Sequence, residues 1–491
     1  MKLFKFLILP LLATSFLSGC SAEEEPAVEE VHVTNAEEFL GKNYDKKVIL
    51  DNDIDLGGAS FTESISAISI EGNGHAIKNA NFSNGKFGKF DFSIFHAQEI
   101  ANLVIDNITF NTSGTTSVGV LTHSDTNKVD NVTIKNCKVT CTGANKYKDF
   151  YYGTFVSGVT IEADANYSKV NKIIRKDVAI TNCKIDNVEI SVDGESKVDN
   201  NYYVGIGLGY GAVNGLVVTN SSVKVKHHTH KGNIYLGGAI GEGSFIKNAE
   251  VSNCKLESES LTYNKDILGA HVLSQTYVGG ITGFMNAKDD LENEELPWHT
   301  LDVSSAHDNE ISAKCLANAY VGGIIGHSRG LVNQVVSYVN KINTSKYLYP
   351  HENDKLYNRH LGGVAGIMYQ GYIESSISYN NAIKDDASEM DELDKIFCGG
   401  LIGKTSETSS GVKKSITRNN TTTSISNNDE FCPSFYKYNN RDCYVTEGTT
   451  NINSLPIYDL NDWENDEKFS ETFGLLDSHW HFEGGLPTLV F

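Results

Sequence analysis

A glycine-rich hexapeptide recurs through the middle of the chain at a nearly constant interval. Complete copies occupy residues 236–241, 278–283, 321–326, 361–366 and 398–403, and degenerate copies occur at 118–120, 152–158 and 204–209. The first glycines, at positions 205, 237, 279, 322, 362 and 399, are 32, 42, 43, 40 and 37 residues apart. A period in this range predicts one array of stacked repeats instead of independent domains.

A second strand pattern follows the glycine unit and ends in asparagine. In five copies the closing residue is Asn136, Asn220, Asn253, Asn340 or Asn380, preceded by alternating Val, Ile or Leu. Such alternation buries one face of a strand. Asparagine tolerates a left-handed turn, and its side chain can stack on the asparagine of the next coil. We therefore expect an all-β solenoid, built from repeats of about 40 residues with roughly two short rungs each.

The glycine unit is not expected to bind a nucleotide. A phosphate-binding loop is a single glycine-rich turn that opens a helix, whereas this unit recurs and no helical pattern follows it. Its glycines instead predict bends or close approaches of another backbone. Lys and Arg number 41 against 62 Asp and Glu, a net charge of −21, which excludes nucleic acid as a partner because no basic face is available.

The first 19 residues predict a secretory signal. Lys2 and Lys5 precede a short apolar stretch that is too short to span a membrane. The following residues, Leu17, Ser18, Gly19 and Cys20, resemble the lipobox of bacterial lipoproteins. The resemblance implies cleavage before Cys20, acylation of that cysteine by chains such as palmitate, and anchoring to a lipid membrane outside the cytoplasm. The alternative is an exported protein with a spare cysteine.

An acidic tether is predicted after the lipidated cysteine. Residues 20–32 contain five glutamates and one proline, a composition typical of a solvated linker. Ser21 is not the aspartate of an inner-membrane retention signal, so in a Gram-negative host the resemblance implies the outer membrane or the cell surface.

The repeat itself resembles the GLUG repeat of bacterial surface proteins. That family includes adhesin-like proteins and the non-catalytic arrays of IgA-specific metallopeptidases. The segments 48–56 and 71–79 resemble the usual entry of such chains, and 480–489 resembles their closing segment. The resemblance implies a right-handed parallel β-helix, with entry rungs at 33–118, the GLUG-like array at 119–430 and a C-terminal capping region at 431–491. It implies no catalytic residue.

The cysteines fall into two groups. Cys137, Cys183 and Cys254 each lie in an Asn-Cys-Lys triplet, which predicts the same position in successive repeats and stacked, buried thiols. Cys432 and Cys443 lie closer together in a loop-rich region and are the better candidates for a disulfide, which an extracytoplasmic location permits.

The histidine and acidic motifs do not predict a metal site or a cofactor. His351 and Glu352 begin a metallopeptidase motif, but the second histidine is absent. The carboxylates of 51–55 depart from the calcium-loop spacing. The histidines of 227–230 are expected in a solvated connection, and His479 and His481 in a cap over the last rung.

A polysaccharide lyase or hydrolase is the main alternative to a binding protein, because parallel β-helices also carry such enzymes. Acidic pairs occur at 289–290 and 385–386, and Arg329 or Arg418 could face a uronate. However, neighbours in a strand point to opposite faces, so neither pair converges in a regular strand. We expect no catalytic residue.

Four segments lengthen individual turns, namely 161–177, 286–300, 343–360 and 383–396. Insertions in solenoids often cluster on the binding face. One of them holds Tyr347, Tyr349 and Tyr357, which suit stacking on sugars or anchoring a protein. The sequence therefore predicts surface binding or adhesion to a glycan or to a host or bacterial surface protein. A non-catalytic structural spacer is the remaining alternative.

Overall fold

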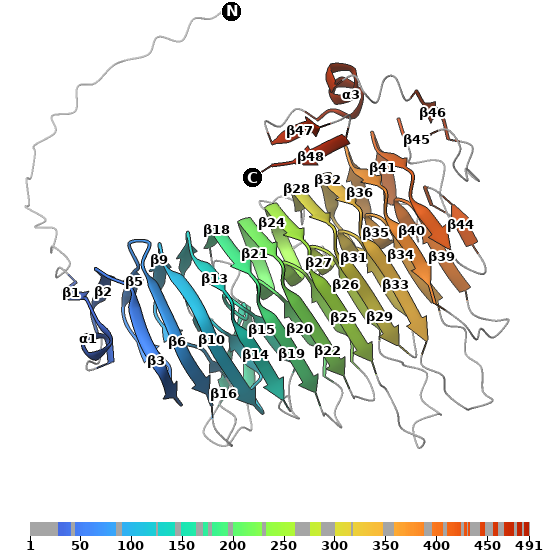
Figure 1. Ribbon diagram of the computed structural model, residues 1–491. Coiled ribbons are helices and arrows are strands. Elements are labelled where there is room, and N and C mark those ends of the chain that lie inside the picture. The colour runs from blue at the N-terminus through green and yellow to red at the C-terminus, as the bar shows by residue number, and fades with distance from the viewer. Residues whose placement is uncertain are drawn as a thin grey trace, which may run out of the picture.

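The computed structural model of the protein is a parallel β-helix (Figure 1). The structure describes residues 28–40, 45–84, 91–123, 126–142, 149–163, 170–174, 179–194, 200–227, 232–260, 275–285, 300–315, 318–346, 358–386, 395–405, 410–423, 427–429, 431–432, 442–446, 455–459, 466–475, 479–483 and 486–490. A ten-stranded sheet forms one side of the coil, and a 32-stranded sheet forms the rest. The predicted fold class, an all-β parallel β-helix, is confirmed.

Each glycine repeat forms one complete coil. The ten-stranded sheet contains the first strand of every coil, and the first glycine of one repeat pairs with that of the next, as Gly237 does with Gly279 and Gly322 with Gly362. These strands are β7 (Asp91–Phe92), β11 (Ser117–Gly119), β15 (Phe150–Gly153), β20 (Tyr202–Gly205), β23 (Ile234–Gly237), β26 (Thr276–Gly279), β30 (Ala319–Gly322), β34 (Asn358–Gly362), β39 (Lys395–Gly399) and β44 (Asn427–Asp429). The expectation of two rungs per repeat is wrong, because both strand signals belong to different sides of one coil.

After the glycine turn the chain continues into the large sheet. The second side contains β21 (Leu208–Thr219), β24 (Ile240–Ser252), β27 (Thr282–Met285), β31 (Ile325–Ser328), β35 (Ala365–Met368) and β40 (Ile402–Thr405). In the later coils the second side is interrupted, and it continues after the break in further strands. These are β28 (Thr300–His307), β32 (Leu331–Tyr338), β36 (Gly371–Glu374), β37 (Ile377–Tyr379), β41 (Ser410–Lys413) and β42 (Ile416–Arg418). The third side contains β14 (Lys138–Thr142), β19 (Glu189–Gly194), β22 (Ser222–His227), β25 (Lys255–Ser260), β29 (Glu310–Cys315), β33 (Lys341–Lys346), β38 (Ala382–Asp385) and β43 (Thr421–Thr423).

The earlier coils follow the same plan. Strands β3 (Ile54–Phe61), β6 (Ala76–Ser83) and β10 (Val104–Ser113) pair in parallel and lead into β14. The chain enters through β1 (Glu30–Val33), the short helix α1 (Ala36–Leu40) and β2 (Lys47–Leu50). Valine, isoleucine and leucine side chains from all sides fill one continuous interior core.

The glycines are required by close backbone packing. A Cβ atom on Gly322 would lie 2.1 Å from the carbonyl oxygen of Ile325 and 2.7 Å from that of Val364 in the next coil. These contacts involve backbone, which cannot rotate away as a side chain can. The sharp turn between the first and second sides therefore excludes every residue with a side chain at this position.

Asparagine in left-handed backbone forms the corner between the second and third sides. The φ angles at this corner lie between 51° and 55°, at Asn136, Asn187, Asn220, Asn253 and Asn380. The Nδ2 of Asn187 donates to Oδ1 of Asn136 at 2.8 Å, so the predicted stacking of side chains is present there. In one coil the expected residue is wrong: Val339, with φ of 55°, makes the turn, and Asn340 points inward.

The C-terminal residues pack on the outside of the coil. Helix α3 (Asp466–Phe473) and the antiparallel pair β47 (Trp480–Glu483) and β48 (Leu486–Leu489) lie beside the later coils (Figure 1). Phe469 and Phe473 join a cluster with the outward-facing Val336 and Ile377, separate from the interior core. The sequence led us to expect this segment over the last rung, whereas the apolar residues on the outer face of the sheet recruit it there.

Candidate functional site

A column of stacked rings runs along the outer face of the ten-stranded sheet. Successive rings are separated by 4.7 to 5.2 Å between centroids, and the planes of each pair are nearly parallel, with angles of 1° to 12°. We call this the aromatic column; it consists of Tyr151, Tyr203, Tyr235, Tyr277, Tyr320, His360 and Phe397. Parallel in-register pairing places equivalent residues of each coil directly above one another, so one aromatic position per repeat builds the whole column.

Strand alternation points the column outward. Tyr202 and Val204 belong to the interior core, whereas Tyr203 between them belongs to a separate aromatic cluster. The column is still well covered, with Tyr235 and Tyr277 only 9% and 6% exposed. Burial removes water from the phenolate and raises the pKa of Tyr235 and of Tyr320 to about 12. The aromatic residue that precedes most glycine units was the sequence signal for this column.

A second row of side chains packs over the column from the next strand. Phe284, His327, Ile367 and Lys404 are equivalent positions of β27, β31, β35 and β40. The Phe284 ring lies 5.3 Å from that of Tyr235 and 5.5 Å from that of Tyr277. The third glycine permits this approach, since a Cβ atom on Gly283 would lie 2.5 Å from the backbone nitrogen of Leu236.

Three of the connections at one corner of the coil are long. Residues 261–274, 347–357 and 387–394 join the third side to β26, β34 and β39, and all therefore enter the sheet that carries the aromatic column. The proposed binding residues Tyr347, Tyr349 and Tyr357 lie outside the described residues. Residues 286–299 and the hairpin β16 (Val159–Ala163) with β17 (Val170–Ile174) belong to another part of the coil, after the glycine turn.

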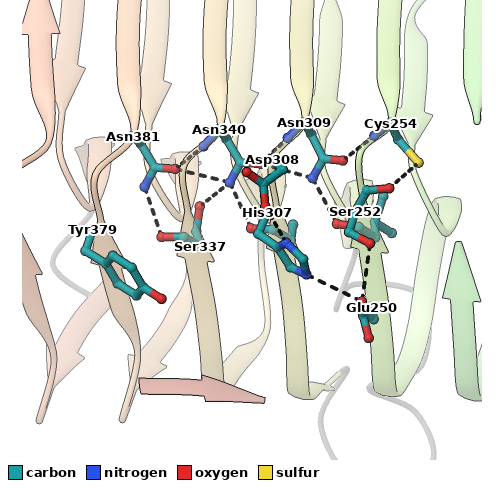
Figure 2. A network of polar contacts seen from close by, with 12 residues as sticks. Glu250, Ser252, Cys254, His307, Asp308, Asn309, Ser337, Asn340, Tyr379 and Asn381 are labelled. Atoms are coloured by element: carbon teal, nitrogen blue, oxygen red, sulfur yellow. Dashed lines mark hydrogen bonds and ion pairs between the residues drawn. The ribbon is translucent and has the colours of Figure 1, made fainter. Parts of the chain in front are cut away.

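An asparagine ladder runs inside the coil at the corner before the third side (Figure 2). Asn309, Asn340, Asn381 and Asn420 are buried and occupy equivalent positions in successive coils. Asn340 Nδ2 donates to Asn381 Oδ1 at 3.1 Å, and the backbone N–H of Asn340 donates to the same oxygen at 2.9 Å. Each amide thus satisfies backbone groups that the corner leaves without a strand partner.

His307 is the last residue of β28, just before this corner, and its side chain points away from the asparagine ladder (Figure 2). Its Nε2 is 3.4 Å from Glu250 Oε1 and its Nδ1 is 2.8 Å from Asp308 Oδ2. Burial acts to lower its pKa, but the hydrogen bonds to Glu250 and Asp308 outweigh that effect and leave the pKa raised. The ring stacks on Tyr338, which stacks on Tyr379, and the Tyr379 hydroxyl donates to the carbonyl of Pro487 in the C-terminal segment at 3.2 Å.

The predicted cysteine positions are partly correct. Cys137 and Cys254 precede equivalent strands and share the column that Asn309 continues, whereas Cys183 pairs with Leu216 on the second side. All three are buried thiols, with a pKa raised by burial to about 12. The Asn-Cys-Lys triplet occurs at two different corners, which the sequence alone does not distinguish. Cys432 and Cys443 are also buried thiols, so the expected disulfide is wrong in this structure.

The acidic pairs do not form a two-carboxylate site in the described part of the chain. Asp385 points inward, 3.3 Å from the guanidinium of Arg359, while Asp386 points outward and pairs with Lys384. Arg418 lies outward in the row of Tyr379. Asp289 and Asp290, and the His351–Glu352 motif, fall outside the described residues.

The remaining predicted motifs have structural surroundings. His227, expected in a solvated loop, is fully buried at the end of β22, where Nε2 bonds to the Asn200 carbonyl at 2.9 Å. Asp53 and Asp55 accept hydrogen bonds from the next coil, from the Ala76 N–H and the Asn79 amide. Among described residues no group of three His, Cys, Asp or Glu is arranged to hold a metal ion.

The lipobox residues Leu17, Ser18, Gly19 and Cys20 lie outside the described residues. In the part of the chain that the structure covers, neither helix has the length and apolar character needed to cross a bilayer. No protein-family model matches the chain, and no curated protein is significantly similar to it.

Proposed function

We propose that this protein is a bacterial lipoprotein, anchored through acylated Cys20, whose β-helix binds a glycan or a surface protein outside the cytoplasm. The lipobox and the signal before it support the anchor, and the GLUG-like repeat supports a surface role. In a Gram-negative host the proposed location is the outer membrane or the cell surface. The proposed body is a rigid scaffold that displays long connections away from the membrane.

One observation carries the binding role. The tyrosine-bearing segment 347–357 leads directly into β34, which contributes His360 to the aromatic column, and two further long segments enter the same sheet. Aromatic rings stack on the apolar faces of sugars and anchor protein partners. The column itself is covered by the second row, so we assign it the role of holding rigid the sheet that these connections enter, and we assign the contacts with an extended ligand to the connections. A purely structural spacer would not need three long connections that enter the same sheet.

The anchor is tested by Cys20→Ala. We expect the variant to leave the membrane fraction and appear in the soluble fraction, because the acyl chains provide the membrane affinity. A variant that still partitions with the membrane would contradict the anchoring proposal.

The binding role is tested by screening the purified protein on a glycan array, then incubating each hit and measuring new reducing ends or unsaturated products. Binding without products supports recognition alone. Products would replace the proposal with an enzyme. If no glycan is bound, capture on intact bacterial or host cells tests the protein-ligand form, and absence of both activities rejects the proposal.

A further inference from the structure

Arg329 and Lys404 lie against aromatic rings near the aromatic column without a carboxylate partner in the described chain. The Arg329 guanidinium carbon is 4.8 Å from the centroid of the Tyr369 ring and 5.9 Å from that of Phe284. The Lys404 ammonium is 5.3 Å from the centroid of the Phe397 ring. Neither cation forms an ion pair with any described residue, although the chain carries 62 acidic residues. The later end of this row thus carries positive charge, whereas Glu242 occupies the equivalent position two coils before His327.

His327 packs between the Tyr320 ring of the aromatic column and the rings that contact Arg329, and it occupies the same row as Lys404, two coils away. Its ring is 4.9 Å from Phe284, 5.9 Å from Tyr320 and 6.1 Å from Tyr369, and the residue is 7% exposed. Neither ring nitrogen has a hydrogen-bond partner within the described chain. The same holds for Arg329 Nε and for Nδ1 of His360, the residue of the column beside Tyr320. A buried polar group left without a partner costs about 1–3 kcal/mol, so several in one cluster call for a specific explanation.

The protonation of His327 limits what it can recognise. Burial first, and then the charge of Arg329, lower its pKa to about 3, so the imidazole is neutral at physiological pH. A neutral imidazole offers one donor and one acceptor. A sugar hydroxyl, which both donates and accepts, matches that pair, and a carboxylate matches the donors of the arginine fork.

We propose that His327, Arg329, His360, Tyr369 and Lys404, here called the basic-aromatic cluster, bind a uronate-containing oligosaccharide. Arg329 and Lys404 hold the carboxylates, His327 and His360 bond to hydroxyls, and the Tyr369 ring stacks on a sugar face. This inference rests on the proposed glycan-binding function and specifies its ligand class. The spacing of one coil between equivalent positions suits a linear ligand that runs along the axis.

The test measures binding of galacturonate and mannuronate tetramers to the purified full chain by isothermal titration calorimetry. The fully methyl-esterified tetramers keep the sugar rings and remove the charge. We expect the acidic tetramers to bind at least tenfold more tightly than the esters. Arg329→Gln should abolish this preference. His327→Phe, which keeps an aromatic ring in the cluster, should weaken both forms. Lys413→Gln, which removes a cation 4.5 Å from the Tyr372 ring in another part of the large sheet, is the matched control and should bind as the unaltered protein does.

Thermal unfolding of each variant shows whether it is folded. Equal binding by the unaltered protein, Arg329→Gln and His327→Phe would overturn the assignment. So would failure of the unaltered protein to bind either acidic tetramer while it binds other glycans on the array; that result leaves the proposed function intact and rejects only this site. Failure to bind any glycan or any cell surface would reject both.

Discussion

Asp385 and Asp386 are adjacent in the sequence, yet their carboxylates lie on opposite sides of the β-helix wall. The Asp385 side chain is fully buried and pairs with Arg359, whereas the Asp386 side chain is half exposed. Thr344 Oγ1 also donates to Asp385 Oδ1 at 2.8 Å. Because one carboxylate faces the interior and the other faces solvent, they cannot act together on one glycosidic bond.

Removing one partner of this buried ion pair should be costly. We expect Asp385→Ala to lower the free energy of unfolding by about 3–5 kcal/mol, because Arg359 is left as a buried charge without its carboxylate. Asp386→Ala, one residue away, should change it by less than about 0.5 kcal/mol. Urea denaturation of the two variants measures the difference. Equal effects would contradict the opposite orientation of the two side chains.

The asparagine ladder should contribute strongly to stability at the corner. Asn340→Ala removes the acceptor for the Asn309 N–H, at 3.1 Å, and the donor to the Ala306 carbonyl, at 2.8 Å. Each buried group left without a partner costs about 1–3 kcal/mol, so we expect a total loss of about 3 kcal/mol. The matched control is Asn380→Gly at the exposed left-handed position, where glycine keeps φ accessible and the loss should stay within about 0.5 kcal/mol. A similar midpoint of unfolding for both variants would reject the role of the ladder.

Stability should depend on the protonation of His307. Its pKa is raised in the folded state, so folding favours the protonated ring. The contribution is complete below the unfolded pKa of about 6.5 and is lost as pH rises through the higher folded value. In the unaltered protein the free energy of unfolding should therefore fall as pH rises from the unfolded pKa of His307 to its folded pKa. We expect this fall to be smaller in His307→Gln. Denaturation curves at several pH values measure this, and an unchanged pH profile would argue against the ion pairs with Glu250 and Asp308.

The glycine turn should not accept a methyl group. Gly322→Ala places a Cβ atom against two backbone carbonyls, and we expect a loss of more than about 3 kcal/mol or failure to fold. Gly57→Ala is the control for conformation without crowding, because Gly57 has φ of 60° and no atom within 4 Å of an added Cβ. Its cost should be about 1–2 kcal/mol. Melting temperatures distinguish the two, and a small shift for Gly322→Ala would contradict the close backbone contact.

The cysteines should be unreactive until the protein unfolds. All eight described cysteines are buried thiols, and burial raises the pKa of Cys141, among others, to about 12. In a Cys20→Ala background we expect almost no reaction with a thiol reagent under native conditions and eight thiols in denaturant without reductant. Six thiols in denaturant would instead indicate a disulfide, with Cys432 and Cys443 as the first pair to examine.

The repeat period and the alternation of apolar residues were sufficient to predict an all-β solenoid, and the resemblance to the GLUG repeat implied that it is a parallel β-helix. Both are local properties: the glycines are required by a turn within each coil, and one face of each strand must be buried wherever the strand lies. The aromatic residue before most glycine units is also a local signal, from which we drew no prediction; in-register stacking turns one such residue per repeat into a column. The sequence assigned Asp385 and Asp386 to the insertion 383–396, which was wrong for its first residues, because Asp385 ends strand β38 and the strand alternation separates the two side chains.

Only the tertiary structure decided how the coils correspond. The register between coils assigned Cys183 to a different corner from Cys137, placed Asn340 inside while Val339 makes the turn, and brought His360 close to Tyr320 and His327 of the preceding coil. The C-terminal segment likewise packs on the outer face because Val336 and Ile377 are apolar there. These relationships join residues tens of positions apart, and they depend on loop lengths and stacking register that no local pattern specifies.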